Sequence, residues 1–152
     1  MLNRAFLLTF ALASIIIISV IQNASGQGPD GPATSSPVLK DAQGNTLSSG
    51  SEGQLAIISI TTFNGSDDPV PFVAIIESRD ESGTTQLLGF SFGSIEDGSQ
   101  SETGISWTPE KAGDYQLRTF LISGFENPQV LTAVRASDVV MSDFCSKKDR
   151  SY

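Results

Sequence analysis

The chain contains no histidine and only one cysteine, Cys145, among its 152 residues. Without an imidazole, neither a Ser-His-Asp triad nor a Cys-His pair can form. Zinc catalysis and blue-copper sites also depend on imidazole ligands. A single cysteine cannot form an intrachain disulfide or a C-x-x-C redox pair. The sequence therefore predicts a protein without catalytic activity and without a cofactor.

Basic residues are scarce as well, since nine Lys and Arg stand against 17 Asp and Glu. Removal of residues 1–26, which contain Arg4 and no acid, would leave eight basic and 17 acidic residues, a net charge of −9. Such a surface repels phosphate backbones, so no nucleic-acid partner is expected. Hydrophobic residues make up 39% of the chain, which is enough for one core and predicts one domain with appendages.

An uncharged apolar run from Ala5 to Ile21 follows Arg4 and ends before the small residues 24–26. Residues 1–26 thus have the three regions of a secretory signal peptide. The run of 17 residues also reaches the lower limit of a membrane span, so a retained signal anchor is a second interpretation. In both cases Arg4 keeps the N-terminus inside the cell and the rest lies outside. Membrane contact is expected only through this segment, if it is not cleaved.

A third interpretation rests on the sequence Arg4-Ala5-Phe6-Leu7, which looks like the processing site of archaeal pilin-type signals. Cleavage would then fall before Phe6, and the apolar helix would be kept and packed into a filament. The chain would in that case be a subunit of a surface filament or of an envelope assembly.

Short apolar runs fill the chain after residues 27–37, whose three prolines and two glycines are typical of a linker. The runs alternate apolar and polar residues, as in Leu88, Phe90 and Phe92, so each predicts a strand with one buried and one wetter face. Seven such strands in residues 38–142 predict an antiparallel β-sandwich, with a small barrel as the alternative. The expected strands are 38–41, 54–63, 71–78, 85–92, 102–107, 115–122 and 129–141.

Three stretches carry a resemblance to a known family. Residues 41–47 (DAQGNTL) look like the turn after a first strand, and residues 54–60 (QLAIISI) look like a second strand. The W-x-P motif at 107–109 and the G-x-Y motif at 113–115 look like the passage into a sixth strand. In these stretches the chain resembles CARDB-style immunoglobulin-like modules of secreted and surface proteins from archaea and bacteria. The resemblance implies the fold and says almost nothing about function.

The two motifs at 107–115 predict a structural corner built from Trp107, Pro109, Gly113 and Tyr115. Trp107 alternates with Ile105 and should point into the sandwich. The hydroxyl of Tyr115, at the start of a strand, is expected to bond back to upstream backbone as a tyrosine corner.

Candidate partner-binding residues lie in turns. Phe125, in the loop 123–128, is the best candidate for an exposed aromatic, because the other phenylalanines are explained by strand alternation. Asp67 and Asp68 form an acidic turn, but no D-x-D-x-D-G loop is present, so we predict no calcium site. A weak calcium site from converging loops, and a hydrolase that uses two loop carboxylates, are the alternatives.

Two positions are candidates for covalent modification. Asn64 begins an N-G-S glycosylation sequon in a turn, and Cys145 could form an intermolecular disulfide. Cys145 lies in a basic tail, residues 143–152, that is expected to fray or to meet an acidic neighbour. The run 129–141 is the candidate edge strand for docking.

Taken together, these features predict a non-catalytic binding or structural module outside the cell. The expected partner is a protein or a component of the cell envelope.

Overall fold

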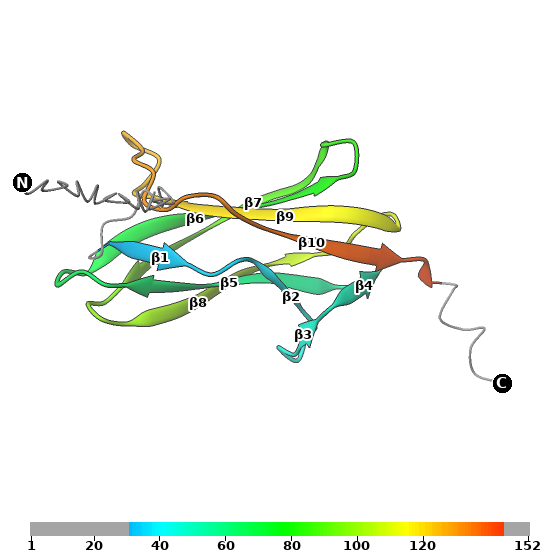
Figure 1. Ribbon diagram of the computed structural model, residues 1–152, viewed down its shortest axis with the longest axis horizontal. Coiled ribbons are helices and arrows are strands. Elements are labelled where there is room, and N and C mark those ends of the chain that lie inside the picture. The colour runs from blue at the N-terminus through cyan, green and yellow to red at the C-terminus, as the bar shows by residue number, and fades with distance from the viewer. Residues whose placement is uncertain (1–30, 145–152) are drawn as a thin grey trace, which may run out of the picture.

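The computed structural model describes residues 31–144, and the named elements in this range are all β-strands that form two packed sheets (Figure 1). Sheet A contains β1 (Pro32–Thr34), β2 (Val38–Lys40), β3 (Thr46–Leu47), β5 (Ala56–Asn64) and β8 (Gln100–Trp107). Within it β5 pairs with β8 on one side and with β1 and β2 on the other, and β3 pairs with β2.

Sheet B contains β4 (Ser49–Ser51), β6 (Val70–Asp80), β7 (Thr85–Ile95), β9 (Gly113–Ile122) and β10 (Arg135–Ser142). Its order is β4-β10-β9-β6-β7, and only the β4–β10 pair is parallel. The chain crosses between the sheets several times, so neither sheet forms from consecutive strands alone. The expected all-β fold of two sheets is confirmed, and the described strands pair antiparallel as expected, apart from β4 with β10.

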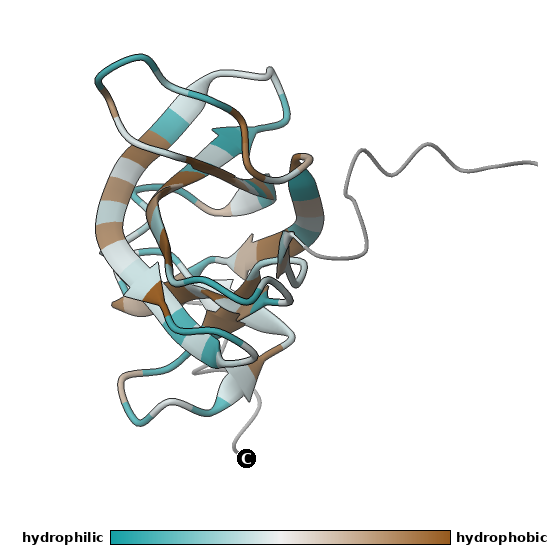
Figure 2. Ribbon diagram, turned by 90° about the vertical axis from the view of Figure 1, so that its left-hand side faces the viewer, coloured by the Kyte–Doolittle hydropathy of each residue, from teal (hydrophilic) through white to brown (hydrophobic). Residues whose placement is uncertain are grey.

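The core lies between the sheets and is filled by every second residue of the strands. Figure 2, seen along the strands, shows the alternating apolar and polar bands. Sheet A contributes Leu39 and Ile58, and sheet B contributes Ile76, Leu117 and Met141, all almost fully buried. Burial of one such side chain stabilises the fold by about 1.5–3 kcal/mol, which favours turning the face that carries these residues inward.

Two hairpin turns are closed by the same arrangement of an aspartate and a glycine. In the β2–β3 turn the Asp41 Oδ1 accepts the backbone N–H of Gln43 and of Asn45, at 2.9 and 2.8 Å. In the β6–β7 turn the Asp80 Oδ1 accepts the N–H of Ser82 and of Thr84, both at 2.9 Å. Gly44 and Gly83 supply the positive φ, 86° and 80°, that each turn requires. The carboxylates of Asp41 and Asp80 therefore stabilise the two turns.

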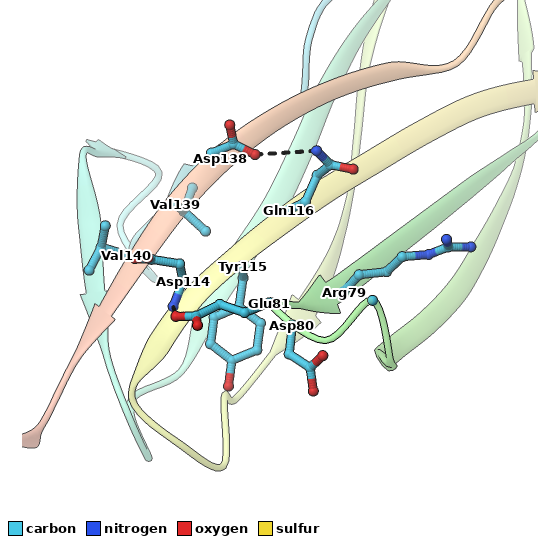
Figure 3. A pocket seen from close by; sticks show the side chains of 10 residues that line it. Arg79, Asp80, Glu81, Asp114, Tyr115, Gln116, Asp138, Val139 and Val140 are labelled. Atoms are coloured by element: carbon cyan, nitrogen blue, oxygen red, sulfur yellow. Dashed lines mark hydrogen bonds between the residues drawn. The ribbon is translucent and has the colours of Figure 1, made fainter.

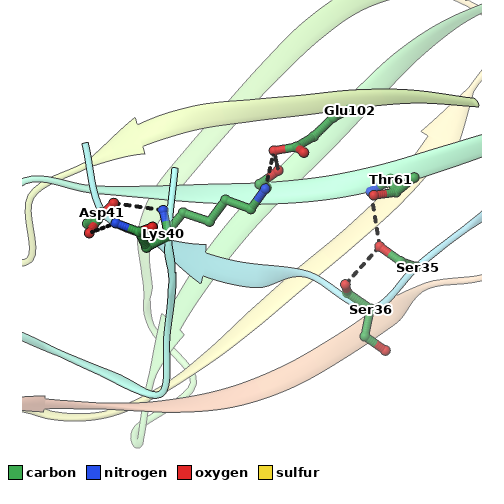
Figure 4. Close-up of polar contacts among 8 residues, drawn as sticks. Ser35, Ser36, Lys40, Asp41, Thr61 and Glu102 are labelled. Carbon is green, nitrogen blue, oxygen red and sulfur yellow. Dashed lines mark hydrogen bonds and ion pairs between the residues drawn. The ribbon is translucent and has the colours of Figure 1, made fainter. Parts of the chain in front are cut away.

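Polar contacts also cover the outer side of sheet A (Figure 4). The Lys40 Nζ lies 2.5 Å from the Glu102 Oε1, which also accepts the hydroxyl of Ser59 at 2.7 Å. The hydrogen bonds from Lys40 and Ser59 lower the pKa of the Glu102 carboxyl. This ion pair joins β2 to β8 across the central strand β5.

The structure adds three short strands to the seven expected. One of them, β1, lies in the segment predicted as a linker: Ala33 pairs with Phe63 of β5, so sheet A begins within residues 27–37. The other two, β3 and β4, span two and three residues. Segments this short carry no readable alternation, which explains why the sequence did not indicate them.

The expected final strand, 129–141, is only partly a strand. Residues 129–134 belong to the β9–β10 loop, apart from a single bridge between Val130 and Ile122. The strand β10 begins at Arg135, and its residues 140–142 pair with β4. The run 129–141 was predicted to be a free edge strand, and this prediction is wrong for its last two residues, which pair with β4.

Candidate binding face

Three phenylalanines form an exposed cluster on the outer side of sheet B. Phe90 and Phe92 lie on β7, and Phe125 lies in the β9–β10 loop. Their ring centroids are 5.3 to 5.7 Å apart, and every pair meets edge to face. The three residues remain 56%, 65% and 54% exposed. Edge-to-face contacts add about 0.5–1.5 kcal/mol per pair, so the rings hold one another in place while most of their surface faces solvent.

In the middle of β7 the large side chains of Phe90 and Phe92 point outward, and the small residues Gly89, Ser91 and Gly93 face inward. On the inner side a Cβ at Gly89 would lie 2.6 Å from the Ile105 Cδ1, and one at Gly93 would lie 2.5 Å from the Phe72 Cζ. The side chains of Ile105, from the other sheet, and of Phe72, from the neighbouring strand β6, thus occupy the inner side of β7. The sequence correctly predicts that this strand alternates. It wrongly places Phe90 and Phe92 on the buried face of the strand, because their side faces solvent. Glycines four residues apart on one face signal such close packing.

The loop that carries Phe125 is fixed by hydrogen bonds at its base. The Ser123 N–H donates to the Gln129 carbonyl at 2.9 Å, and the Gln129 N–H donates to the Ser123 hydroxyl at 3.0 Å. The Leu121 N–H donates to the buried Thr132 hydroxyl at 3.0 Å. Figure 1 shows this loop standing above sheet B at the end of β9. Phe125 is therefore held against β7 by its loop.

Further apolar side chains extend the cluster. Leu88 is 67% exposed on the same side of β7, and Val130 in the loop is 73% exposed. Beneath the rings, Val73 pairs with Phe92 and Ile75 with Phe90 on the neighbouring strand β6. We call the exposed residues Leu88, Phe90, Phe92, Phe125 and Val130 the aromatic face. Contiguous exposed apolar surface of this kind marks interaction sites in folded proteins.

A charged cluster borders the aromatic face next to Leu88. The Glu77 carboxylate accepts the Arg79 Nε at 2.8 Å, the Thr85 hydroxyl at 2.6 Å and the Arg118 guanidinium at 3.1 Å. Burial raises the pKa of Glu77, but the hydrogen bonds from Arg79 and Thr85 and the charges of both arginines outweigh it, so the pKa lies below its usual value. This cluster separates the aromatic face from a polar end of the sheet.

At that polar end, a shallow cleft of about 640 Å³ lies between the β6–β7 turn and strands β9 and β10. Figure 3 shows Asp80, Glu81 and Asp114 around it, with Arg79 pointing away. Among residues 31–144 no three His, Cys, Asp or Glu side chains gather closely enough to hold a metal ion. Asp80 is engaged in its turn, so the cleft offers no assembled ligand set.

Asp67 and Asp68 are exposed in the β5–β6 turn, and their neighbour Asn64 is fully buried. The Asn64 Nδ2 donates to the carbonyls of Asp68, Ile95 and Glu96 at 2.9, 3.0 and 3.3 Å. Its Oδ1 accepts the N–H and the hydroxyl of Ser66 at 3.0 and 2.7 Å. A glycan on Nδ2 is incompatible with this geometry, so the interpretation of Asn64 as an exposed sequon is wrong for the folded domain.

The four corner residues lie where β8 passes into β9. The Tyr115 hydroxyl donates to the Lys111 carbonyl at 2.8 Å, and the Trp107 and Tyr115 rings meet edge to face at 5.1 Å, both nearly buried. Burial, with the charges of Asp80, Glu110 and Glu52, raises the pKa of the Tyr115 hydroxyl. The Pro109 carbonyl accepts the Gly53 N–H at 2.8 Å, and Gly113 has a φ of 144°. These residues join the turn to the core and to the β4–β5 loop.

Comparison with solved structures places this arrangement among known folds. The C-terminal domain of Wzt matches with a TM-score of 0.60 and 14% identity, over 76% of this chain and 75% of that one. The CARDB domain of the PF1109 protein from Pyrococcus furiosus, solved in complex with di-metal ions, matches with a TM-score of 0.54 and 15% identity, over 74% of this chain and 96% of that one. The domain is an immunoglobulin-like β-sandwich. The predicted resemblance to CARDB domains is confirmed at the level of the fold.

Other comparisons add no function. A β-glucosidase from Erythrobacter marinus matches with a TM-score of 0.53 and 12% identity, but over only 15% of its own chain. No protein-family model matches the sequence, and no curated protein matches it. At these identities the likeness extends to the fold alone.

Several predicted features lie outside the described residues: the leader 1–26, Cys145 and residues 145–152 of the basic tail. Between residues 31 and 144 no helix is long and apolar enough to cross a membrane.

Proposed function

We propose that this immunoglobulin-like domain is a non-catalytic binding or structural module that works outside the cell. Its partner, a protein or an envelope component, docks on the aromatic face. The observation that carries the proposal is the cluster of Phe90, Phe92 and Phe125, each more than half exposed and fixed in mutual contact. Aromatic side chains have few rotatable bonds to immobilise when they bind, and they are enriched at the centres of protein interfaces.

The chemistry of the face suits binding and not catalysis. Phenyl and aliphatic side chains have no group that can transfer a proton or attack a substrate. The Glu77 carboxylate, which lies opposite Leu88 on β6, is already paired with two arginines. The uncharged leader at 5–21 supports a location outside the cell. The proposal applies equally to a released module and to a membrane-anchored or filament subunit, because the face belongs to the folded domain.

Replacing the three phenylalanines together (F90S, F92S and F125S) should release the domain from its partner complex. Envelopes and medium of the producing cell are treated with mild detergent, and the full chain is sized by gel filtration. We expect the wild type in a complex larger than its own 16.1 kDa and the triple variant as separate chains. The variant should stay folded, since none of the three rings belongs to the core between the sheets.

The matched control is F63S, because Phe63 is also half exposed, at 47%, but lies on β5 in the other sheet. It should elute with the wild type. Elution of the triple variant with the wild type would disprove the assignment of the aromatic face.

A further inference from the structure

The strand β7 is an edge of sheet B that lacks the usual protection against pairing. It pairs with β6 on one side and ends the sheet on the other. Its eleven residues, TQLLGFSFGSI, include no charge and no proline. Soluble proteins normally protect long edge strands with lysine, proline, a bulge or a cover, because the free N–H and C=O groups pair readily with another strand.

The edges of sheet A differ in this respect. The edge strand β8 carries the exposed carboxylate of Glu102, and β1 is three residues long and begins with Pro32. The pairing of β7 with β6 is irregular only near the β6–β7 turn, where the register shifts between Ser78 and Arg79 of β6. The free side of β7 is thus the long unprotected edge among the described strands.

We propose that a second copy of this chain pairs antiparallel with β7 about a twofold axis, which joins two B sheets into one. This inference rests on the proposed function, since it makes the aromatic face a binding surface and names its occupant. The strand runs from residue 85 to residue 95, so full overlap of two copies places Phe90 on the axis. A twofold contact requires a self-complementary surface, and β7 has one in this register.

The pairs that this register creates fit on both sides of the strand. On the outer side Leu88 lies opposite Phe92 of the second copy, and Phe90 lies opposite its own equivalent. Cross-strand pairs of aromatic and aliphatic residues are stabilising, by about 0.2–1 kcal/mol each. On the inner side Leu87 lies opposite Gly93, and Gly89 lies opposite Ser91, so that no two large side chains meet. The phenyl ring of each Phe125 lies beside the joined strands and enlarges the apolar contact.

The strand β7 itself carries no charge, so the acids that the pairing brings toward one another lie beyond its ends. The β6–β7 turn, with Asp80 and Glu81, would approach Glu96 and Asp97 beyond the end of β7 in the second copy. These acids repel one another through solvent, and salt screens such repulsion. Pairing should therefore strengthen as the ionic strength is raised, which an association driven by ion pairs would not do.

Disulfide trapping in the full chain tests the register. All variants carry C145S, which removes the only native thiol. In F90C two thiols meet at the axis, so mild oxidation near 0.5 M salt, with protein on the order of 100 μM, should give a covalent dimer. In L88C alone the equivalent thiols lie four residues apart along the strand, about 13 Å, which is beyond the reach of a disulfide. We expect at least tenfold more dimer from F90C.

An equal mixture of L88C and F92C supplies the second measurement, because it keeps Phe90 in place. The mixture should cross-link between the two variants, while each variant alone should not. The proposal is overturned if F90C and the mixture give no more dimer than L88C alone, or if L88C and F92C each cross-link as well as F90C. The cross-linking tests could fail while the triple variant (F90S, F92S and F125S) is still released from its complex. In that case the aromatic face binds another partner, and only the proposal of a second copy is wrong.

Discussion

Replacing Asn64 by alanine is expected to lower the free energy of unfolding by about 3 kcal/mol. The side chain is fully buried and makes five hydrogen bonds, which link the β5–β6 turn to the end of β7 and to the β7–β8 loop. Its loss removes the donor to three carbonyls and the acceptor of the Ser66 N–H. Buried groups without partners cost about 1–3 kcal/mol each, and water can replace only part of these contacts.

The variant N64D separates the hydrogen bonds from the volume of the side chain. Aspartate has the shape of asparagine, but at neutral pH it turns a carboxylate toward the carbonyls of Asp68, Ile95 and Glu96. N64D should therefore be at least as unstable as N64A when unfolding by urea is measured at pH 7. The control is N45A, in which an exposed asparagine loses its bond to Asp41 and should cost less than about 1 kcal/mol. Equal stability of N64A and N45A would show that the Asn64 contacts contribute nothing.

The second large effect concerns Glu77, where E77Q is expected to cost about 2 kcal/mol at pH 7. The Glu77 side chain is only 13% exposed and lies between Arg79 and Arg118 on the outer side of sheet B. Hydrogen bonds to charged partners contribute about 1.5–3 kcal/mol. A neutral amide of the same shape would leave the half-buried Arg118 without its counter-charge.

This effect should depend on pH in a defined direction. Because the folded pKa of Glu77 lies below the usual value of 4.5, the unfolded chain takes up the proton first as the pH falls. The contribution of Glu77 is therefore complete above about pH 4.5 and is lost as the pH falls through the folded pKa. The stability gap between wild type and E77Q should shrink on acidification, whereas E126Q, at an exposed loop residue, should show little gap at any pH. A gap that stays constant from pH 7 to pH 3 would contradict this account of the cluster.

Much of the fold could be predicted from the sequence because alternation is a local signal. The runs around Ile58 and Leu117 alternate, and each forms a strand of the sandwich with these residues in the core. The turn signals at Asp41 and Asp80 also depend only on neighbouring residues. The expected bond from the Tyr115 hydroxyl to upstream backbone involves a carbonyl four residues away.

The binding face could not be predicted in the same way, because alternation does not show which face of a strand is buried. On β7 the larger residues would ordinarily be assigned to the core. The assignment is reversed here by Phe72 and Ile105, whose side chains fill the space beside Gly93 and Gly89. That contact joins β7 to β6 and to β8 in the other sheet, so it depends on the tertiary arrangement. Phe125 was expected to be exposed, but its ring partners were not.

Asn64 shows the same limit in a polar residue. The sequon at 64–66 and a turn composition predicted exposure, since turns usually lie at the surface. The structure buries the amide because Ile95 and Glu96, 31 and 32 residues away in sequence, place their carbonyls beside it. The short strands β1, β3 and β4 depend likewise on partners elsewhere in the chain.

Hydroxyl-radical footprinting on intact producing cells tests the aromatic face most directly. Oxidation of individual phenylalanines is compared between the domain in place on the cell and the isolated domain at high dilution. We predict that Phe90, Phe92 and Phe125 are protected several-fold on the cell, while Phe63, on the other sheet, is oxidised equally in both samples. Oxidation of the three cluster residues on the cell to the same extent as in the isolated domain would contradict the account.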